Sequence, residues 1–323
     1  GVVTCGQDVV FEARSGTQNA TKARFAACGS PLAFFIVMSG SSCNPSGLTP
    51  VILLPGMLGS TTADLNDYAH PTLPNGAAPG SDYTDWGGRR PLRSRYGLFG
   101  YGQVGWKATI EQLEDNFGYE LGCTLFPAPY DWRMSIDTIA TTYLSAVIAN
   151  AKTTSGAAKV DIIAHSMGGL VARSYIQDIR RFATDADVDV NRLAMVGTPN
   201  LGSLKAYYLW QGGDVERADA GDSLRLYERT VEYLWKQATP SVTVTGDFLL
   251  IGKSEIKSFV QREIPAAQWL MPAFPFLKSS VLSPTVELPP QTENRPLLEL
   301  NSNAQWRASG GASSLRGVAV KAF

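Results

Sequence analysis

Ser166 is the residue of this chain whose surroundings best fit a nucleophile. It lies in the stretch KVDIIAHSMGGLVARSY, where an apolar run stops at a serine among small residues. Val160 to Ala164 form a short run that is typical of a buried parallel strand. Gly168 and Gly169 allow a tight reversal, and Leu170 to Ile179 then predict a helix. A serine on such a strand, turn and helix has a strained backbone that exposes its hydroxyl.

We interpret this arrangement as a nucleophile elbow. The usual pattern is G-x-S-x-G, and Ala164 stands here in place of the first glycine, which is the smallest change available. The alternative is a surface serine on an ordinary strand-to-helix turn. The predicted strand before Ser166 and the predicted helix after it favour the elbow.

A serine nucleophile needs backbone N–H groups that stabilise the oxyanion of the reacting ester. One comes from the residue after the nucleophile, and one from the loop that follows an early strand. Met167 and Met57 occupy these positions, because the apolar run TPVILLPGMLGS predicts a strand that enters a turn at Pro55 and Gly56. The alternative for Pro55 and Gly56 is an ordinary strand exit.

The serine also needs an imidazole to take its proton and an acid to orient that imidazole. The expected chain order is Ser, then Asp or Glu, then His, yet no histidine follows Ser166. His165 adjoins the nucleophile, and we expect its side chain to point away from that of Ser166. His70 precedes the elbow, and we interpret it as a solvated loop residue.

Composition and charge exclude several function classes. The 323 residues are 44% hydrophobic and 18% charged, as in an ordinary globular protein. A net charge of −1 gives no electrostatic basis for binding nucleic acid. With two histidines the chain offers no zinc pattern, so we expect neither a metal nor a cofactor.

Four cysteines are present: Cys5, Cys28, Cys43 and Cys123. Because three of them lie in the first 43 residues, we predict one disulfide there and a buried thiol at Cys123. Lys22 to Cys43 resembles an export signal, although it starts late and its apolar part is too short to span a bilayer. The alternative is a strand in an N-terminal extension. The cysteines and this stretch favour a secreted, periplasmic or lumenal protein.

The order of strands and helices predicts the fold. Residues 1–47 form an extension with strands at Asp8–Ala13 and Leu32–Met38. From residue 48 to 202, strands alternate with helices, which specifies a mostly parallel, doubly wound sheet. The predicted helices in this part are Ile110–Phe117 and one that contains Ile136 to Ile148, and the predicted strands include Glu120–Phe126 and Arg192–Gly197.

Two segments interrupt this alternation. Residues 60–105 are rich in Gly, Pro, Asn, Asp and aromatic residues and predict a lid loop beside the oxyanion strand. Residues 203–311 predict an inserted cap with helices at Leu204–Trp210 and Ser223–Ala238. Residues 312–323 then resume a core strand, Arg316–Phe323.

The cap contains an apolar run broken by prolines, QWLMPAFPFL. Its large side chains would line an acyl pocket or touch a lipid surface. The alternative is that they only pack the cap onto the core. These residues are Trp269, Leu270, Met271, Phe274 and Phe276.

Several motifs together resemble the lecithin:cholesterol acyltransferase-like α/β hydrolases, a family that includes lysosomal phospholipase A. They are PVILLPGMLGS, FPAPYDWR, AHSMGG, GTPNLGS, IPAAQWLMP and LLELN, in the expected order between residues 49 and 323. The resemblance implies an α/β-hydrolase fold, with Ser166 as nucleophile and Met57 and Met167 as oxyanion positions. Residues 130–133, YDWR, match a family motif that we interpret as structural, fixing the loop beside the site.

In this family the acid would follow the strand placed at Arg316–Phe323, and the histidine would follow one strand later. Both would therefore lie beyond Phe323, and the chain does not begin with methionine. We accordingly expect a fragment that lacks the C-terminal acid and histidine and is inactive by itself. A strand left as an unpaired edge at the end of a chain is also unfavourable.

Two functions follow from the sequence. The first is a serine-dependent lipid acyl-ester hydrolase or O-acyltransferase, which acts through an acyl-enzyme on a phospholipid or other long-chain ester at a membrane or lipoprotein surface. The second is a non-catalytic hydrolase-fold protein that binds lipid or a partner, since no histidine follows Ser166. Head group, chain length, acceptor and oligomeric state are not specified by the sequence.

Overall fold

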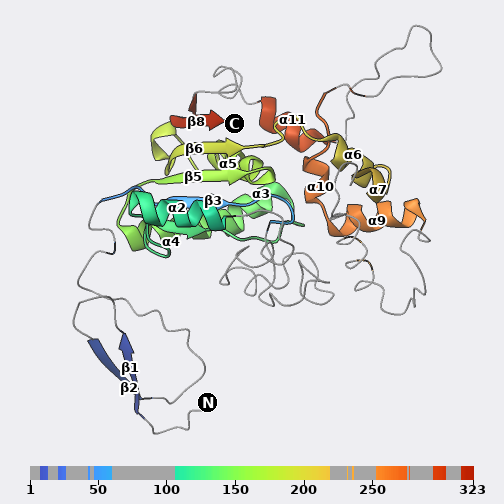
Figure 1. The fold of residues 1–323 in the computed structure, drawn as a ribbon. Helices are drawn as coiled ribbons and strands as arrows, with labels where there is room; N and C mark the ends of the chain where they lie inside the picture. The colour runs from blue at the N-terminus through green and yellow to red at the C-terminus, as the bar shows by residue number, and fades with distance from the viewer. Residues whose placement is uncertain are drawn as a thin grey trace, which may run out of the picture. The chain divides into compact units, whose positions relative to one another are not determined.

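The computed structural model describes residues 8–13, 21–26, 43, 47–59, 106–218, 231, 235, 252–274, 276, 294–302 and 314–323 (Figure 1). The predicted lid loop at 60–105 lies outside these residues. So do His70, the strand predicted at Leu32–Met38 and most of the helix predicted at Ser223–Ala238. No helix among the described residues is long and apolar enough to cross a membrane.

The chain divides into two compact units, residues 1–41 and residues 42–323. The first contains the antiparallel strands β1 (Asp8–Ala13) and β2 (Thr21–Ala26), in which Asp8 lies opposite Ala26. The strand predicted at Asp8–Ala13 is confirmed. Lys22 and Arg24, the charged start of the signal-like stretch, lie in β2.

The second unit is built on a sheet with the strand order β4-β3-β5-β6-β8-β7. The neighbouring pairs β3–β4, β3–β5, β5–β6 and β6–β8 are parallel, as predicted, and only the edge strand β7 runs antiparallel. The strands are β3 (Val51–Leu54), β4 (Leu125–Pro127), β5 (Val160–His165), β6 (Val190–Val196), β7 (Ser314–Leu315) and β8 (Val318–Ala322).

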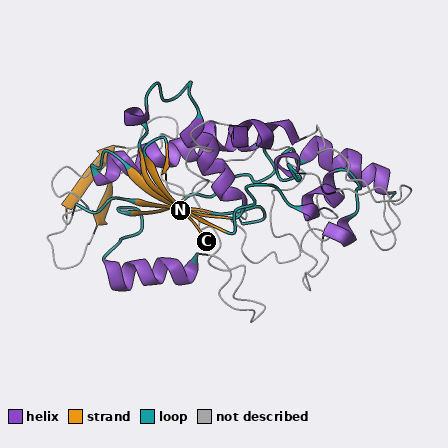
Figure 2. Ribbon diagram, turned by 90° about the horizontal axis from the view of Figure 1, so that it is seen from above, coloured by secondary structure: helices purple, strands orange, loops and turns teal. Residues whose placement is uncertain are grey.

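Helices cover both faces of this sheet, because the side chains of each strand alternate between the two faces. Val51 and Leu53 of β3 pack with Ile110 of α2 (Lys107–Phe117) on one face. Ile52 and Leu54 belong to the larger core on the other face. That core is covered by α3 (Ile136–Thr138), the π-helix η1 (Ile139–Leu144), α4 (Ser145–Ser155) and α5 (Met167–Gln177). In Figure 2, among the described helices, α2 lies on one side of the sheet and α3, α4 and α5 lie on the other.

The segment predicted as a strand at Glu120–Phe126 is mostly a turn. The carbonyl oxygen of Glu120 accepts the N–H groups of Cys123, Thr124 and Leu125 at 3.1, 2.9 and 2.9 Å. β4 therefore begins only at Leu125. The prediction was wrong at this boundary because the apolar residues of the turn resemble those of a strand.

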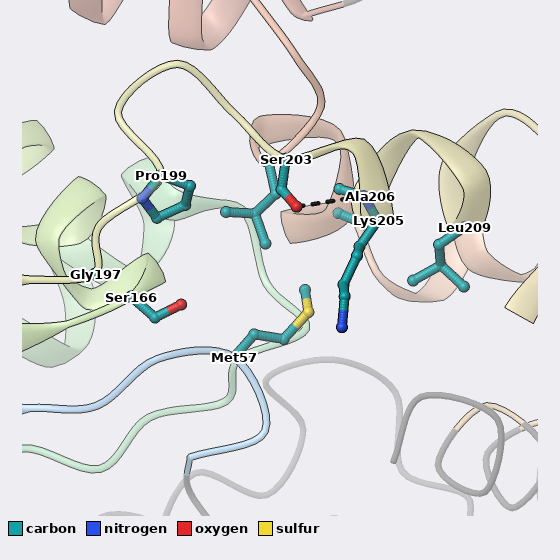
Figure 3. A pocket seen from close by; sticks show the side chains of 10 residues that line it. Met57, Ser166, Gly197, Pro199, Ser203, Lys205, Ala206 and Leu209 are labelled. Carbon is teal, nitrogen blue, oxygen red and sulfur yellow. Dashed lines mark hydrogen bonds between the residues drawn. The ribbon is translucent and has the colours of Figure 1, made fainter. Parts of the chain in front are cut away.

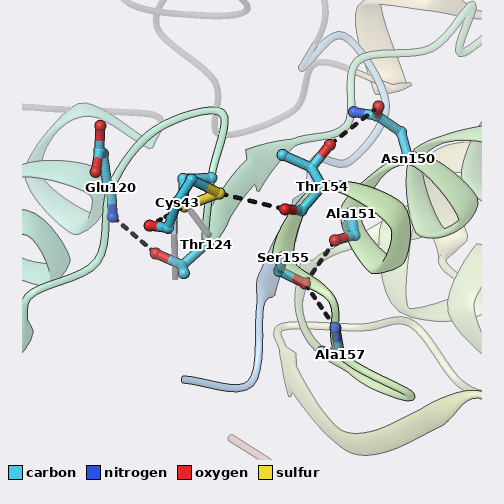
Figure 4. The surroundings of a disulfide bond; sticks show 9 residues. Cys43, Glu120, Thr124, Asn150, Ala151, Thr154, Ser155 and Ala157 are labelled. Carbon is cyan, nitrogen blue, oxygen red and sulfur yellow. Dashed lines mark hydrogen bonds between the residues drawn. A yellow bond between two sulfur atoms is a disulfide. The ribbon is translucent and has the colours of Figure 1, made fainter. Parts of the chain in front are cut away.

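The prediction for Cys123 was also wrong. Cys123 is buried but forms a disulfide with Cys43, and the two Cα atoms are 5.6 Å apart (Figure 4). The two cysteines are 80 residues apart in the sequence, so their spacing alone did not indicate this pairing. The chain from Cys43 enters β3, and the parallel pairing of β3 with β4 brings the turn before β4 next to it. Cys5 and Cys28 lie outside the described residues.

We predict that this disulfide stabilises the second unit. The double variant Cys43→Ser, Cys123→Ser, with Cys5 and Cys28 left in place, should lose about 2 to 4 kcal/mol of unfolding free energy, because the bridge restrains a long loop in the unfolded chain. Urea unfolding of both proteins measures the difference. A change below about 0.5 kcal/mol would contradict the prediction.

The helices of the predicted cap lie beyond the carboxyl ends of the strands, toward which the arrowheads of β5, β6 and β8 point in Figure 1. The helix predicted at Leu204–Trp210 is present with these bounds as α6. The backbone N–H of Ser203, the N-cap of α6, donates to the carbonyl of Leu270 at 2.7 Å. The other helices are α7 (Val215–Ala218), α9 (Lys253–Glu263), α10 (Ala266–Trp269) and α11 (Arg295–Ser302).

The strand predicted at Arg316–Phe323 is present as β8, and the short strand β7 precedes it to form a hairpin. β7 and β8 are joined by Arg316 and Gly317, which both have positive φ angles, 48° and 74°. Two such residues suit the tightest hairpin turn. The buried Arg316 guanidinium donates to Asp185 Oδ1 at 3.0 Å and to the carbonyl of Phe182 at 2.7 Å. This arrangement anchors the β7–β8 hairpin, in which β8 pairs with β6 and β7 is the edge strand.

Candidate active site

Ser166 lies between β5 and α5, as the elbow interpretation requires. β5 ends at His165 and α5 begins at Met167. Ser166 has φ 52° and ψ −126°, a backbone conformation that residues other than glycine rarely adopt. Such strain persists only where the surroundings enforce it. The backbone N–H of Ser166 is held by the carbonyl of Val196 in β6, at 2.8 Å.

Three glycines make room around this serine. A Cβ added to Gly168 would lie 2.5 Å from the carbonyl oxygen of Pro55 and 2.6 Å from that of Leu54. A Cβ on Gly169 would meet Thr198 Oγ1 at 2.0 Å, and one on Gly56 would meet the Cβ of Ser166 at 2.7 Å. Only glycine lets α5 and the β3 loop approach so closely.

Ala164 stands where the usual pattern has its first glycine. It is completely buried in β5 and pairs with Leu54 of β3 and Met195 of β6. The site therefore accepts a methyl group here, which explains the departure from the pattern.

Met57 and Met167, the two predicted oxyanion positions, come from different segments of the chain. Met57 belongs to a turn after β3, and Met167 is the first residue of α5. The first N–H groups of a helix have no partner within it, so the start of α5 can donate to an anion. Met57 and Ser166 line the same pocket.

That pocket has a volume of about 250 Å³ and lies between the elbow and α6 (Figure 3). Figure 3 shows Ser166 at one end and Leu209 of α6 at the other. The wall is mostly apolar, and Ser203 and Lys205 add polar groups. The lining residues are Met57, Ser166, Gly197, Pro199, Ser203, Lys205, Ala206, Leu209, Ala267 and Leu270.

Of the five cap residues predicted for an acyl pocket, Leu270 is among those that line this one. Met271 is buried against the core instead, and its carbonyl touches Gly202. The ring of Phe276 packs edge-on against the ring of Tyr207, with 4.8 Å between the ring centroids. Phe274 in turn packs against Phe276. Trp269 also packs against the core, so this one run both contributes to the pocket wall and packs the cap onto the core.

The model of the lecithin:cholesterol acyltransferase family matches residues 98–304, which is more than half of the chain. The chain belongs to this family. It has the α/β-hydrolase fold, with a mainly parallel sheet and helices on both faces. No curated protein matches this family member in sequence.

Solved structures similar to this lecithin:cholesterol acyltransferase-family chain include three with low identity. Phospholipase PlaB from Legionella pneumophila is 15% identical with TM-score 0.36, over 85% of this chain and 38% of its own. Lipase 1 from Pelosinus fermentans is 13% identical with TM-score 0.29, over 68% and 58%. EstA from Clostridium botulinum is 12% identical with TM-score 0.30, over 87% and 72%. The chain thus spans 38% of the length of the phospholipase.

The family motif YDWR connects the β3 loop with the cap. The buried Tyr130 hydroxyl donates to the carbonyl of Pro55, and burial raises the pKa of this phenol. Arg133 forms a buried bidentate ion pair with Asp131, at 2.9 and 2.8 Å. The carbonyl of Arg133 accepts the N–H of Ala266 in α10 at 3.0 Å.

A buried arginine that the sequence reading missed ties α5 to the cap. Arg173, about two turns into α5 from the elbow, donates to Asn200 Oδ1 at 2.9 Å and to the carbonyl of Leu300 in α11 at 3.1 Å. Burial lowers its pKa. Gln177 donates to the same carbonyl at 2.9 Å. The sequence did contain a signal for this contact. A buried arginine in a helix of small and apolar residues such as MGGLVARSY must find hydrogen-bond acceptors.

His165, at the end of β5, is not among the residues that line the pocket. Partial burial lowers its pKa below the ordinary value, which favours the neutral ring. The pocket of this family member is lined by no histidine or carboxylate among the described residues.

Proposed function

We propose that this protein is a serine-dependent lipid acyl-ester hydrolase or O-acyltransferase, with Ser166 as the nucleophile. The observation that carries the proposal is the strained Ser166 between β5 and α5, at a pocket whose lining combines apolar side chains with Ser203 and Lys205. Family membership supports chemistry on lipid esters in general. The proposed substrate is a phospholipid or another ester with a long acyl chain.

In the proposed reaction, a base takes the proton of the Ser166 hydroxyl as Oγ attacks the ester carbonyl. A Ser–acyl bond forms, the ester C–O bond breaks, and the alcohol leaves with the proton from the base. The N–H groups of Met57 and Met167 would stabilise the oxyanion. Water or an alcohol acceptor then attacks the acyl-enzyme and gives its proton to the base. The base passes this proton to Ser166 Oγ as the Ser–acyl bond breaks and the acyl product leaves. None of the described residues that line the pocket carries an imidazole, so the proposed base is a residue outside this set.

Exposed apolar side chains beside the pocket support action at a membrane or lipoprotein surface. Leu201 and Leu204, which flank pocket-lining Ser203, are 59% and 46% exposed. Phe274 is exposed as well, and the N–H of its neighbour Ala273 donates to the carbonyl of Leu201. We propose that these side chains contact lipid. The Cys43–Cys123 disulfide further supports a secreted, periplasmic or lumenal location.

The alternative is a non-catalytic protein that binds lipid or a partner with the same pocket. It is favoured by one observation, that neither histidine of residues 1–323 follows Ser166. In that case the pocket would hold an ester without cleaving it.

A product assay separates these functions. The full-length protein is incubated with phospholipid vesicles and a long-chain alcohol, and the lipids are separated. We expect free fatty acid, with fatty ester in addition if the protein transfers acyl groups. Vesicles that bind the protein and keep their phospholipid intact would contradict catalysis and support the alternative.

A further inference from the structure

Backbone pairing between β3 and β4 stops just before residues 55–59, PGMLG, which we call the oxyanion loop. The N–H of Ala128 donates to the carbonyl of Leu53 at 2.9 Å. Further along, Pro55 has no N–H with which to continue the ladder. Beyond this point a side chain connects the segment after β3 with the segment after β4, because the Tyr130 hydroxyl donates to the carbonyl of Pro55.

The oxyanion loop is a strained turn. The N–H of Gly59 donates to the carbonyl of Gly56 at 3.0 Å, with Met57 and Leu58 as the central residues. Leu58 has φ 61°, although a turn of this kind usually has glycine there. Such a conformation must be enforced by neighbouring groups.

The carbonyl of Pro55 is held from two sides. Tyr130, which is completely buried, donates to it, and Gly168 of α5 lies so close that a Cβ there would be 2.5 Å from the oxygen. Since the peptide unit is planar, fixing this carbonyl fixes the N–H and the Cα of Gly56, the residue from which the chain continues into Met57.

We infer that Tyr130 is a positioning residue, whose hydroxyl holds the oxyanion loop so that the Met57 N–H faces the substrate oxygen. The inference rests on the proposed function of Ser166 and Met57, and deepens it. Tyr130 itself touches neither substrate nor the reacting atoms; it acts through the carbonyl of Pro55.

The variant Tyr130→Phe removes this hydroxyl and keeps the ring. Losing one oxyanion donor outright costs about 10²- to 10³-fold in kcat, so a misplaced donor should cost about 10- to 100-fold. KM should stay within about twofold, because the oxyanion forms only in the transition state.

Tyr143→Phe is the matched control. Tyr143 is also buried, at 2% exposure, and its hydroxyl contacts Met134 Sδ at 3.1 Å rather than the oxyanion loop. Both variants lose one buried hydroxyl and should lose stability. Only Tyr130→Phe should lower kcat. It should also raise the Ki of a long-chain trifluoromethyl ketone, which mimics the oxyanion, by the same factor as kcat/KM falls.

A second readout does not require turnover. In protein labelled with [¹³C]methyl-methionine, the Met57 signal, assigned with Met57→Leu, should shift in Tyr130→Phe and stay in place in Tyr143→Phe. An unmoved Met57 signal, or equal losses of kcat in the two variants, overturns the inference. If the wild type shows no turnover, the proposed function fails, and the Met57 signal still decides whether Tyr130 positions the loop.

Discussion

Ser166→Ala is expected to lower acyl-ester turnover by at least about 10⁴-fold while the protein remains folded. The reason is that the acyl group has no other proposed attachment point, and the oxyanion donors alone leave only residual catalysis. Alanine fits the elbow, since a methyl side chain is smaller than the hydroxymethyl it replaces. Initial rates on a phospholipid, with circular dichroism to verify the fold, measure the effect.

Ser155→Ala is a suitable control for this variant. Ser155 is a buried serine at the end of α4, where its hydroxyl donates to the carbonyl of Ala151 at 2.7 Å, and it does not line the pocket. Its replacement should leave turnover unchanged. Equal activity of Ser166→Ala and wild type would show that another group carries the reaction.

Gly168→Ala is expected to damage both stability and activity. In an ordinary helix this change gains about 0.5 to 1 kcal/mol. Here the new methyl group would lie 2.5 Å from the carbonyl oxygen of Pro55 and 2.6 Å from that of Leu54, and neither backbone atom can rotate away. We expect a loss of about 1 to 3 kcal/mol in unfolding free energy, as in other overpacked sites.

Activity should fall further than stability, because α5 and the oxyanion loop must separate to admit the methyl group. A displacement of 1 Å in a site can cost about 10²-fold in rate. Gly252→Ala, at the N-cap of α9, is the control. The nearest atom to its added Cβ would be Glu255 Oε2 at 3.4 Å, which is an ordinary contact distance. An increase in unfolding free energy in Gly168→Ala would contradict the close packing of Gly168 against the carbonyl oxygens of Leu54 and Pro55.

The elements around Ser166 could be predicted because each is specified locally. The apolar run before Ser166 becomes β5, and the small residues after it begin α5. Parallel order also follows from the alternation of strands and helices. The Cys43–Cys123 disulfide could not be predicted in this way, because it depends on which strands become neighbours after 80 residues of chain.

The lining of the pocket likewise depends on how distant elements pack, and so could be predicted only in part. The sequence singled out the apolar run that contains Leu270, but α6 supplies more of the lining, including Ala206 and Leu209. The helix itself was predictable, whereas the face it turns toward Ser166 depends on how its N-cap docks on Leu270. Tyr130 was visible only as part of a motif, and its contact with Pro55 requires the fold.

Trapping the acyl-enzyme tests the central claim most directly. The full-length protein is mixed with a phospholipid, quenched in acid within one turnover, digested and analysed by mass spectrometry. We expect the peptide that contains Ser166 to carry the mass of one acyl group, and the Ser166→Ala protein to carry none. Turnover with an acyl group on a different residue, or with no acylated peptide at all, would contradict Ser166 as the nucleophile.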